Sequence, residues 1–88
     1  MKEKITVLIA DDNVDFVSTL KKYFEQKENM EVIAVAKDGN EAFDKIVQYK
    51  PDVALLDVIM PHLDGIGVLE KLNAVTLEKY PFCVMISA

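Results

Sequence analysis

Residues 51–57, with the sequence PDVALLD, decide the fold because they show how an apolar run of this chain begins and ends. Pro51 interrupts the chain, and Asp52 is interpreted as the turn residue that starts the run. The apolar core covers residues 53–56, and Asp57 follows it directly. A short run that is apolar at successive positions is typical of a strand buried on both faces, as in a parallel sheet.

Three further runs of this kind, with helical spacing between them, extend the pattern over the chain. They cover residues 5–10, 31–36 and 82–86. Between the runs, apolar residues recur at intervals of three and four, which predicts three amphipathic helices. The apolar positions are Val17, Leu20 and Phe24, then Ala42, Phe43, Ile46 and Val47, then Ile66, Leu69 and Leu72.

The boundaries between these elements carry turn and cap residues. We expect Asn13 to cap the first helix, Asn29 to end it, and the dipeptide Asp38-Gly39 to close the second strand. Strands and helices therefore alternate from the first strand to the fourth. This order predicts an α/β fold, a doubly wound parallel sheet with right-handed crossovers and helices on both faces.

Composition excludes several classes of protein. With 88 residues the chain forms one domain, and no apolar stretch approaches the roughly 20 residues that cross a bilayer. The net charge is −5 and every basic residue is lysine, which argues against direct contact with nucleic acid. The single cysteine, Cys83, forms no internal disulfide and indicates a reducing compartment, the cytoplasm. We expect Cys83 and the methionines to pack in the core.

Acidic and hydroxyl side chains follow three of the predicted strands. Asp11 and Asp12 follow the first strand, Asp57 the third and Ser87 the fourth. In open α/β sheets, sites form outside the carboxyl ends of the strands, so these side chains are expected to meet. Any one of these aspartates alone is more often a turn former or a helix cap, and Asp12 has that alternative.

Three carboxylates close together repel one another, so we expect their charge to be neutralised. Two carboxylates about 4 Å apart repel by roughly 4 kcal/mol at an effective dielectric constant near 20. They either take up protons or share a cation, and an all-oxygen site favours Mg²⁺ or Ca²⁺. A cation beside Asp57 could hold a phosphoryl group in line with its carboxylate, which would form an acyl phosphate. Ser87 could then donate a hydrogen bond to that phosphate.

The sequence resembles the receiver domains of two-component response regulators. The resemblance rests on VLIADDN (residues 7–13), DGNEAF (38–43) and PDVALLDVIMPHLDG (51–65), and it covers the whole chain in order. It implies a flavodoxin-like fold in which Asp57 is the phospho-acceptor. Within the family, the stretch DVIMPHLDGIGVLEKL (57–72) is most similar to sporulation regulators of endospore-forming bacteria.

The resemblance also implies roles for the neighbouring residues. Asp11 and Asp12 would hold the metal, together with Asp57 and the main-chain carbonyl of Ile59, and Ser87 would be the switch hydroxyl. Pro61, Asp64 and Gly65 would shape the loop before the third helix.

Partners and outputs are implied in the same way. A histidine kinase or phosphotransfer protein would donate the phosphoryl group. Phosphorylation would drive dimerisation and release a C-terminal DNA-binding domain. The receiver would then act as a switch rather than as an enzyme.

One departure concerns the length of the chain. The family has a further helix, a fifth strand that carries a lysine, and a closing helix, whereas this sequence stops at Ala88. None of its lysines can take the family lysine's place, because all precede the fourth strand. We therefore expect residues 1–88 to form a partial receiver that binds metal but phosphorylates poorly. Its fourth strand would be an exposed edge that favours self-association.

Two other readings of the residues remain open. A phosphatase of the haloacid dehalogenase type also uses an aspartate after a strand, but it carries a second aspartate where this chain has Ile59. The other alternative is an interaction module that keeps the fold without phosphorylation. His62 is interpreted as a solvated loop residue rather than a phospho-donor.

Overall fold

Four parallel strands and three helices alternate along the chain in the computed structural model, which describes residues 4–86. The strands pair in the order β2-β1-β3-β4, so β1 and β3 are central. The expected α/β fold with a parallel sheet is confirmed. The elements are β1 (Ile5–Ala10), α1 (Val14–Glu25), β2 (Met30–Ala36), α2 (Gly39–Tyr49), β3 (Val53–Asp57), α3 (Gly65–Asn73) and β4 (Phe82–Ile86).

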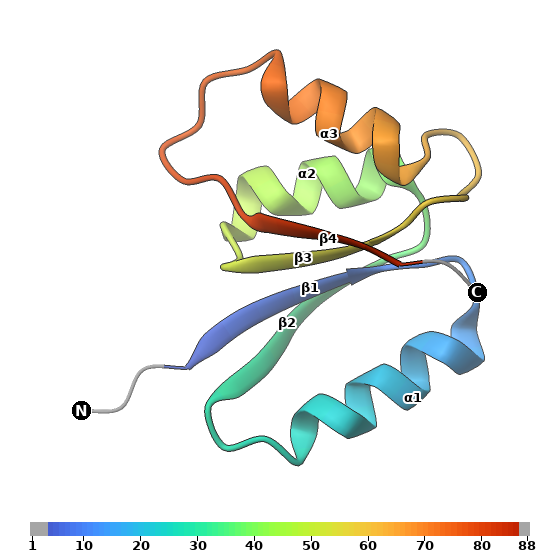
Figure 1. Ribbon diagram of the computed structural model, residues 1–88, viewed down its shortest axis with the longest axis vertical. Helices are drawn as coiled ribbons and strands as arrows, with labels where there is room; N and C mark the ends of the chain where they lie inside the picture. The colour runs from blue at the N-terminus through green and yellow to red at the C-terminus, as the bar shows by residue number, and fades with distance from the viewer. Residues whose placement is uncertain (1–3, 87–88) are drawn as a thin grey trace.

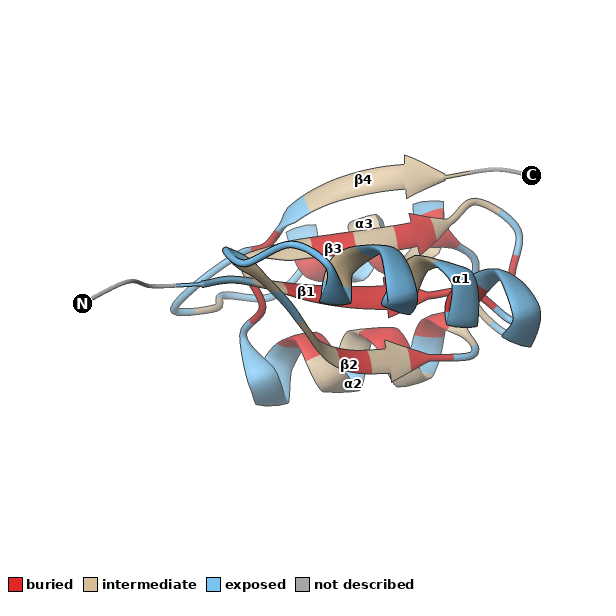
Figure 2. Ribbon diagram, turned by 90° about the horizontal axis from the view of Figure 1, so that it is seen from below, coloured by how far each residue is buried: buried red, intermediate tan, exposed pale blue. Residues whose placement is uncertain are grey.

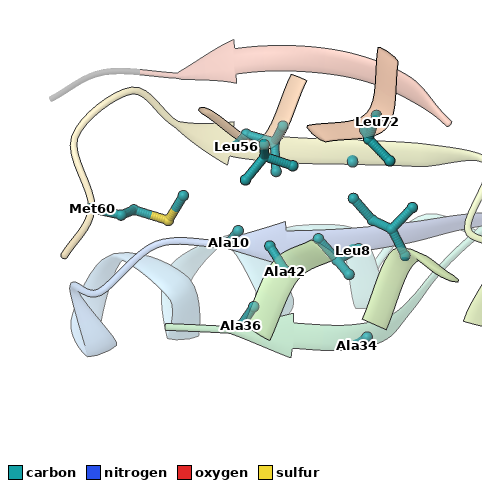
Figure 3. Close-up of a cluster of buried hydrophobic side chains, with 11 residues drawn as sticks. Leu8, Ala10, Ala34, Ala36, Ala42, Leu56, Met60 and Leu72 are labelled. Atoms are coloured by element: carbon teal, nitrogen blue, oxygen red, sulfur yellow. The ribbon is translucent and has the colours of Figure 1, made fainter. Parts of the chain in front are cut away.

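The helices lie on both faces of the sheet, with α1 on one side and α2 and α3 on the other (Figure 1). The larger core lies under α2 and α3, where Leu8, Leu56 and Leu72 are almost fully buried (Figure 3). The smaller core lies under α1, where Val17 packs on Val7 and Ile9. Alternate residues of β1 belong to alternate cores, which explains why this strand is apolar throughout.

Each helix begins at a side-chain cap. The carboxamide of Asn13 accepts a hydrogen bond from the Phe16 amide at 3.0 Å, as predicted for the first helix. Asp38 caps α2, and Asp64 caps α3 by accepting from the amide of Gly67 at 2.7 Å. Such caps satisfy main-chain donors that have no partner within the helix.

Several predicted details are wrong. The first helix ends at Glu25 and not at Asn29, because the amide of Gln26 folds back onto Tyr23 and tightens the last turn. Asn29 instead accepts from the amide of Ile5, so its main chain already belongs to the start of the sheet. In α2 and α3, Val47 and Ile66 lie on the exposed side, and Val68 takes the core position expected of Ile66.

The exposed and buried residues agree with the remaining expectations. Figure 2 shows that β1 and β3 are buried along their centres while much of α1 is exposed. Met60 is buried, Cys83 is half-buried against the larger core, and His62 is exposed. No helix among residues 4–86 is long and apolar enough to cross a bilayer.

Candidate functional site

The three acidic residues meet at the carboxyl ends of β1 and β3. The two strands pair directly, with Ala10 opposite Leu56, so the residues that follow them leave the sheet side by side. One carboxylate oxygen from each of Asp11, Asp12 and Asp57 lies within 4.8 Å of the other two. The expected convergence of the three aspartates is therefore present, and it arises from the topology because 42 residues of sequence separate the end of β1 from the start of β3.

Asp11 is the most buried of the three, with 7% of its surface exposed. Its Oδ1 accepts a hydrogen bond from the Asn13 amide at 2.9 Å, and its own amide donates to the carbonyl of Ala36. Burial raises the pKa of Asp11, and the charges of Asp57 and Asp12 raise it further, although the Asn13 amide acts in the opposite direction. A cation placed among these groups would relieve both the burial cost and the repulsion.

The loop after Asp57 holds that carboxylate from the main chain. The amide of Ile59 donates to Asp57 Oδ1 at 3.2 Å, while the Ile59 side chain is 78% exposed. The amide of Val58 donates to the carbonyl of Ile86, which ties the loop to the end of β4. The Asp57 carboxylate is therefore held by the turn that follows it, and that turn is held by the end of β4.

Two glycines let the loop pack closely on its surroundings. A Cβ on Gly65 would lie 2.6 Å from the carbonyl oxygen of Asp57, and a Cβ on Gly39 would lie 2.0 Å from that of Leu63. Both distances are shorter than real carbon–oxygen contacts allow, so only glycine fits. The start of α2 and the start of α3 therefore position the loop that follows Asp57. The role expected for Gly65 in shaping the loop has this physical basis.

The middle of the loop contains an unusual turn. The amide of Leu63 donates to the carbonyl of Pro61 at 2.7 Å, and the central residue, His62, has a φ of 68°. A three-residue turn of this hand is rare and strained for residues other than glycine. The interpretation of His62 as a merely solvated residue missed this turn, because no sequence signal beyond the preceding proline marks it.

The other predicted site residues lie in the loop before α3 or outside the described residues. Asp64 caps α3, and Pro61 is exposed in the turn. Ser87, the predicted switch hydroxyl, lies outside the described residues. The roles of the three aspartates and of the Ile59 carbonyl as ligands or acceptor stay predictions.

A fourth aspartate, Asp52, makes more contacts than its predicted role at the start of the third strand requires. Asp52 starts β3, as expected, but its carboxylate also accepts hydrogen bonds from the amide and hydroxyl of Thr6, at 2.8 and 3.0 Å, and from Lys79. The Lys79 hydrogen bond, followed by those of Thr6, lowers the pKa of Asp52 to about 2. This carboxylate lies at the opposite end of the strands from the acidic site and connects β1, β3 and the segment before β4.

The arrangement at the carboxyl end has two chemical consequences. Three converging carboxylates, one of them buried, could hold a hard divalent cation through oxygen ligands. In the described residues, 4–86, no lysine pairs with any of the three, so their charge is not neutralised by the protein there. A carboxylate beside such a cation is also placed to react with a phosphoryl group.

Comparisons with known proteins agree with this geometry. The family model described as the response regulator receiver domain matches residues 7–88. The chain is 36% identical to the response regulator domain of CheB from Thermotoga maritima, with a TM-score of 0.86 over 97% of this chain and 61% of that one. It is 35% identical to a chain in the CheX-CheY-BeF₃-Mg²⁺ complex from Borrelia burgdorferi, with a TM-score of 0.85 over 98% of this chain and 63% of that one.

A third solved structure shows the same likeness. The signal receiver domain of the putative response regulator NarL from Mycobacterium tuberculosis is 32% identical, with a TM-score of 0.88 over 98% of this chain and 68% of that chain. The sequence thus spans about three fifths to two thirds of the length of these chains. A receiver domain is a phosphorylation switch rather than a catalytic enzyme, and its acidic pocket is formed here by Asp11, Asp12 and Asp57. On the match of residues 7–88 and these identities, the chain belongs to the response regulator receiver domain family.

Proposed function

We propose that Asp57 is the phospho-acceptor of this receiver domain. The observation that carries the proposal is the convergence of Asp11, Asp12 and Asp57 to within 4.8 Å at the carboxyl ends of two paired strands. Asp57 is more exposed than Asp11, and its carboxylate oxygen accepts a main-chain hydrogen bond from the following loop, at Ile59. Its position is therefore defined before any partner binds.

The other two acids are assigned to the metal. Asp11 and Asp12 are proposed to hold Mg²⁺ or Ca²⁺ with Asp57 and the Ile59 carbonyl, and the oxygen donors fit either ion. When bound, the cation supplies positive charge that neutralises phosphoryl oxygens. Asn13 keeps Asp11 oriented through its amide. The loop residues Pro61, Asp64 and Gly65 keep Asp57 in place, and Ser87 is proposed to donate to the bound phosphate.

The group transfer is a displacement at phosphorus. A carboxylate oxygen of Asp57 forms the new P–O bond while the P–N bond of a donor phosphohistidine breaks. The leaving imidazole nitrogen takes a proton, and the product is an acyl phosphate. The aspartate must therefore be ionised, and its neighbours must be neutralised before a second anionic group can approach.

Relatives support this assignment. One matched structure is of a receiver in complex with CheX, BeF₃ and Mg²⁺, and that chain is 35% identical to this one. We propose a histidine kinase or a phosphotransfer protein as the donor for this chain. The phosphatase alternative has no support in the site, since Ile59 stands where such enzymes carry a second aspartate.

The finer part of the proposal concerns the output. We propose that phosphorylation switches dimerisation and a C-terminal transcription-factor domain that controls sporulation. Its support is the resemblance of residues 57–72 to sporulation regulators. Transfer from a phosphorelay protein of a spore former, compared with transfer from a chemotaxis kinase, tests this part. Faster transfer from the chemotaxis kinase would contradict it.

Intact-mass spectrometry after incubation with acetyl phosphate and Mg²⁺ tests the acceptor. We expect one phosphoryl group to be added to the wild type, slowly because residues 1–88 are expected to phosphorylate poorly, and none to Asp57→Asn. Asp52→Asn is the matched control, because it removes the same charge from the other end of β3. Modification of Asp57→Asn would show that another residue is the acceptor. Absence of modification in the wild type would contradict the proposal, provided that circular dichroism shows a folded chain.

A further inference from the structure

A groove lies at the open edge of the sheet, away from the acidic site. It has a volume of about 360 Å³ and is lined by residues 32–35 of β2, by Lys21 of α1, and by Lys45 and Tyr49 of α2. β2 pairs with β1 on one side only, and it lies at the far edge of the sheet from β4 (Figure 2). Since α1 and α2 cover opposite faces, the groove spans the edge itself.

The groove is basic in a protein that is acidic overall. Lys21 also lines two adjoining hollows, of about 390 and 270 Å³, which bring Lys22 to one of them and Lys4 and Lys27 to the other. Five of the ten lysines in the sequence therefore gather along this edge, with two glutamates, whereas the whole chain has a net charge of −5. An anionic partner would be attracted to this side of the molecule and repelled by the rest.

Two features keep the main chain of β2 from pairing with another strand at this edge. The pairing of β1 with β2 skips Ile33, since Val7 pairs with Val32 and Leu8 with Ala34. Lys45 Nζ donates to the carbonyl of Val35 at 2.6 Å and also pairs with Glu41 of its own helix at 3.3 Å. A bulge and a lysine on an edge strand are features that keep free edges from pairing at random. Ile33 belongs to neither core and lines the groove instead.

We propose that this groove docks an extended acidic segment of a partner protein, which adds to β2 as a further strand. A carboxylate of the segment would draw the Lys45 ammonium away from Val35, whose carbonyl would then accept a main-chain amide of the segment. A neutral strand has no carboxylate to bind the Lys45 ammonium, so Lys45 stays on the Val35 carbonyl and β2 cannot pair there. Lys45 thus makes docking depend on negative charge.

A second copy of the chain does not fit this edge. Two-fold pairing of β2 with itself would place the same lysines of each copy against one another. Like charges across an interface oppose association and suppress such pairings. The charge pattern therefore favours a different protein that carries alternating acidic and apolar residues.

A synthetic peptide of about eight residues with alternating glutamate and valine, long enough to pair along a strand, is the probe. Its controls are the same peptide with glutamine in place of glutamate, and the acidic peptide with methylated backbone nitrogens. Amide shifts in nitrogen-15 spectra locate the binding. We expect shifts centred on Ile33, Val35 and Lys45, and binding of the acidic peptide about tenfold tighter than of either control.

Two variants test the role given to the lysine. Lys45→Met keeps the length of the side chain but removes its charge, so it should reduce the preference for the acidic peptide over the glutamine peptide severalfold. Lys71→Met, a matched change on α3, should leave the preference intact. Equal binding of the glutamine or methylated peptide to the wild type would overturn the proposal. So would shifts centred on Asp11, Asp12 and Asp57, or no saturable binding at all.

Discussion

At the carboxyl ends of β1 and β3, three aspartates face one another, whereas at the amino ends of the same strands one aspartate faces a lysine and a threonine. Burial and its acidic neighbours raise the pKa of Asp11. Hydrogen bonds from Lys79 and Thr6 lower the pKa of Asp52 to about 2. The same side chain is therefore destabilised as an anion at one end of the sheet and stabilised at the other.

The two ends also differ in what holds their loops. At the amino end, side chains connect the segments: Asp52 reaches Thr6 and Lys79, and Lys50 pairs with Glu78 at 2.5 Å. At the carboxyl end, main chain packs on main chain at Gly39 and Gly65. Because the backbone positions the loops there, the acidic side chains accept main-chain hydrogen bonds but pair with no lysine in the described residues, and they can serve a ligand. This division suits a site whose charges must remain available.

The largest expected effect comes from breaking the backbone packing at the carboxyl end. In Gly39→Ala the new Cβ would lie 2.0 Å from the Leu63 carbonyl oxygen, so either α2 or the loop must move. We expect the free energy of unfolding to fall by about 3 kcal/mol, the upper range for overpacking. Urea denaturation measures it.

Gly67→Ala is the control for that change. Its new Cβ would meet the end of the Leu63 side chain at 2.4 Å, which can move aside more easily than a carbonyl group. The cost should stay below about 1 kcal/mol, because alanine also favours the helix. Equal losses in the two variants would show that backbone contact is not what fixes this end.

The next largest effect is expected from Mg²⁺, which should stabilise the protein through the carboxyl ends of the strands and not through the amino ends. If Mg²⁺ binds at the acidic site, a hundredfold excess over its dissociation constant should stabilise the folded chain by about 2.7 kcal/mol. Asp12→Asn should lose most of this gain, while Asp52→Asn should keep it. Thermal unfolding with Mg²⁺ and with EDTA measures the difference. Without metal, Asp12→Asn should be slightly more stable than the wild type, since one repelling charge is gone. The same gain in both variants would place the ion elsewhere.

Lowering the pH should remove the contribution of Asp52 to the free energy of unfolding over a defined pH range. Its folded pKa of about 2 lies below the ordinary value of 3.8, so the carboxylate stabilises the fold above about pH 4, and this contribution fades as the pH falls towards 2. Because the group is partly exposed, we expect Asp52→Asn to cost only about 1 kcal/mol at pH 7. Denaturation curves of both proteins should converge near pH 2. A constant difference down to that pH would mean that charge is not the cause.

The central part of the acidic site was predictable because it follows from strand order alone. An apolar run followed by an aspartate at β1 and again at β3, in a right-handed parallel sheet, leaves Asp11 and Asp57 as neighbours. The role of Asp52 was not predictable in the same way. Its partners Thr6 and Lys79 lie 46 and 27 residues away, and neither belongs to a recognisable motif.

Local details failed where tertiary contacts outweigh local preference. Asn29 was expected to end α1, but its carbonyl is required by the amide of Ile5, so the helix stops at Glu25 and the chain turns earlier. Ile66 fits the apolar stripe of α3 but faces outwards, since Gly65 must lie against the carbonyl of Asp57 and that sets the rotation of the helix. The register of a short helix is decided by such contacts rather than by periodicity.

The smallest expected effect concerns the strained turn between Asp57 and α3. His62 has a φ of 68°, which costs a residue with a side chain about 1 kcal/mol and costs glycine almost nothing. In His62→Gly, the greater freedom of glycine in the unfolded chain offsets part of that gain, so we expect a net stabilisation of about 0.5 kcal/mol. His62→Ala keeps the strain and is the control, since it removes the imidazole without releasing φ. Urea denaturation of both variants distinguishes release of backbone strain from loss of the imidazole. Equal stabilisation in His62→Ala would show that the imidazole, and not the backbone, is the cause. The gain in the glycine variant alone would show that the carboxyl end carries backbone strain, whereas the amino end is held by side-chain hydrogen bonds.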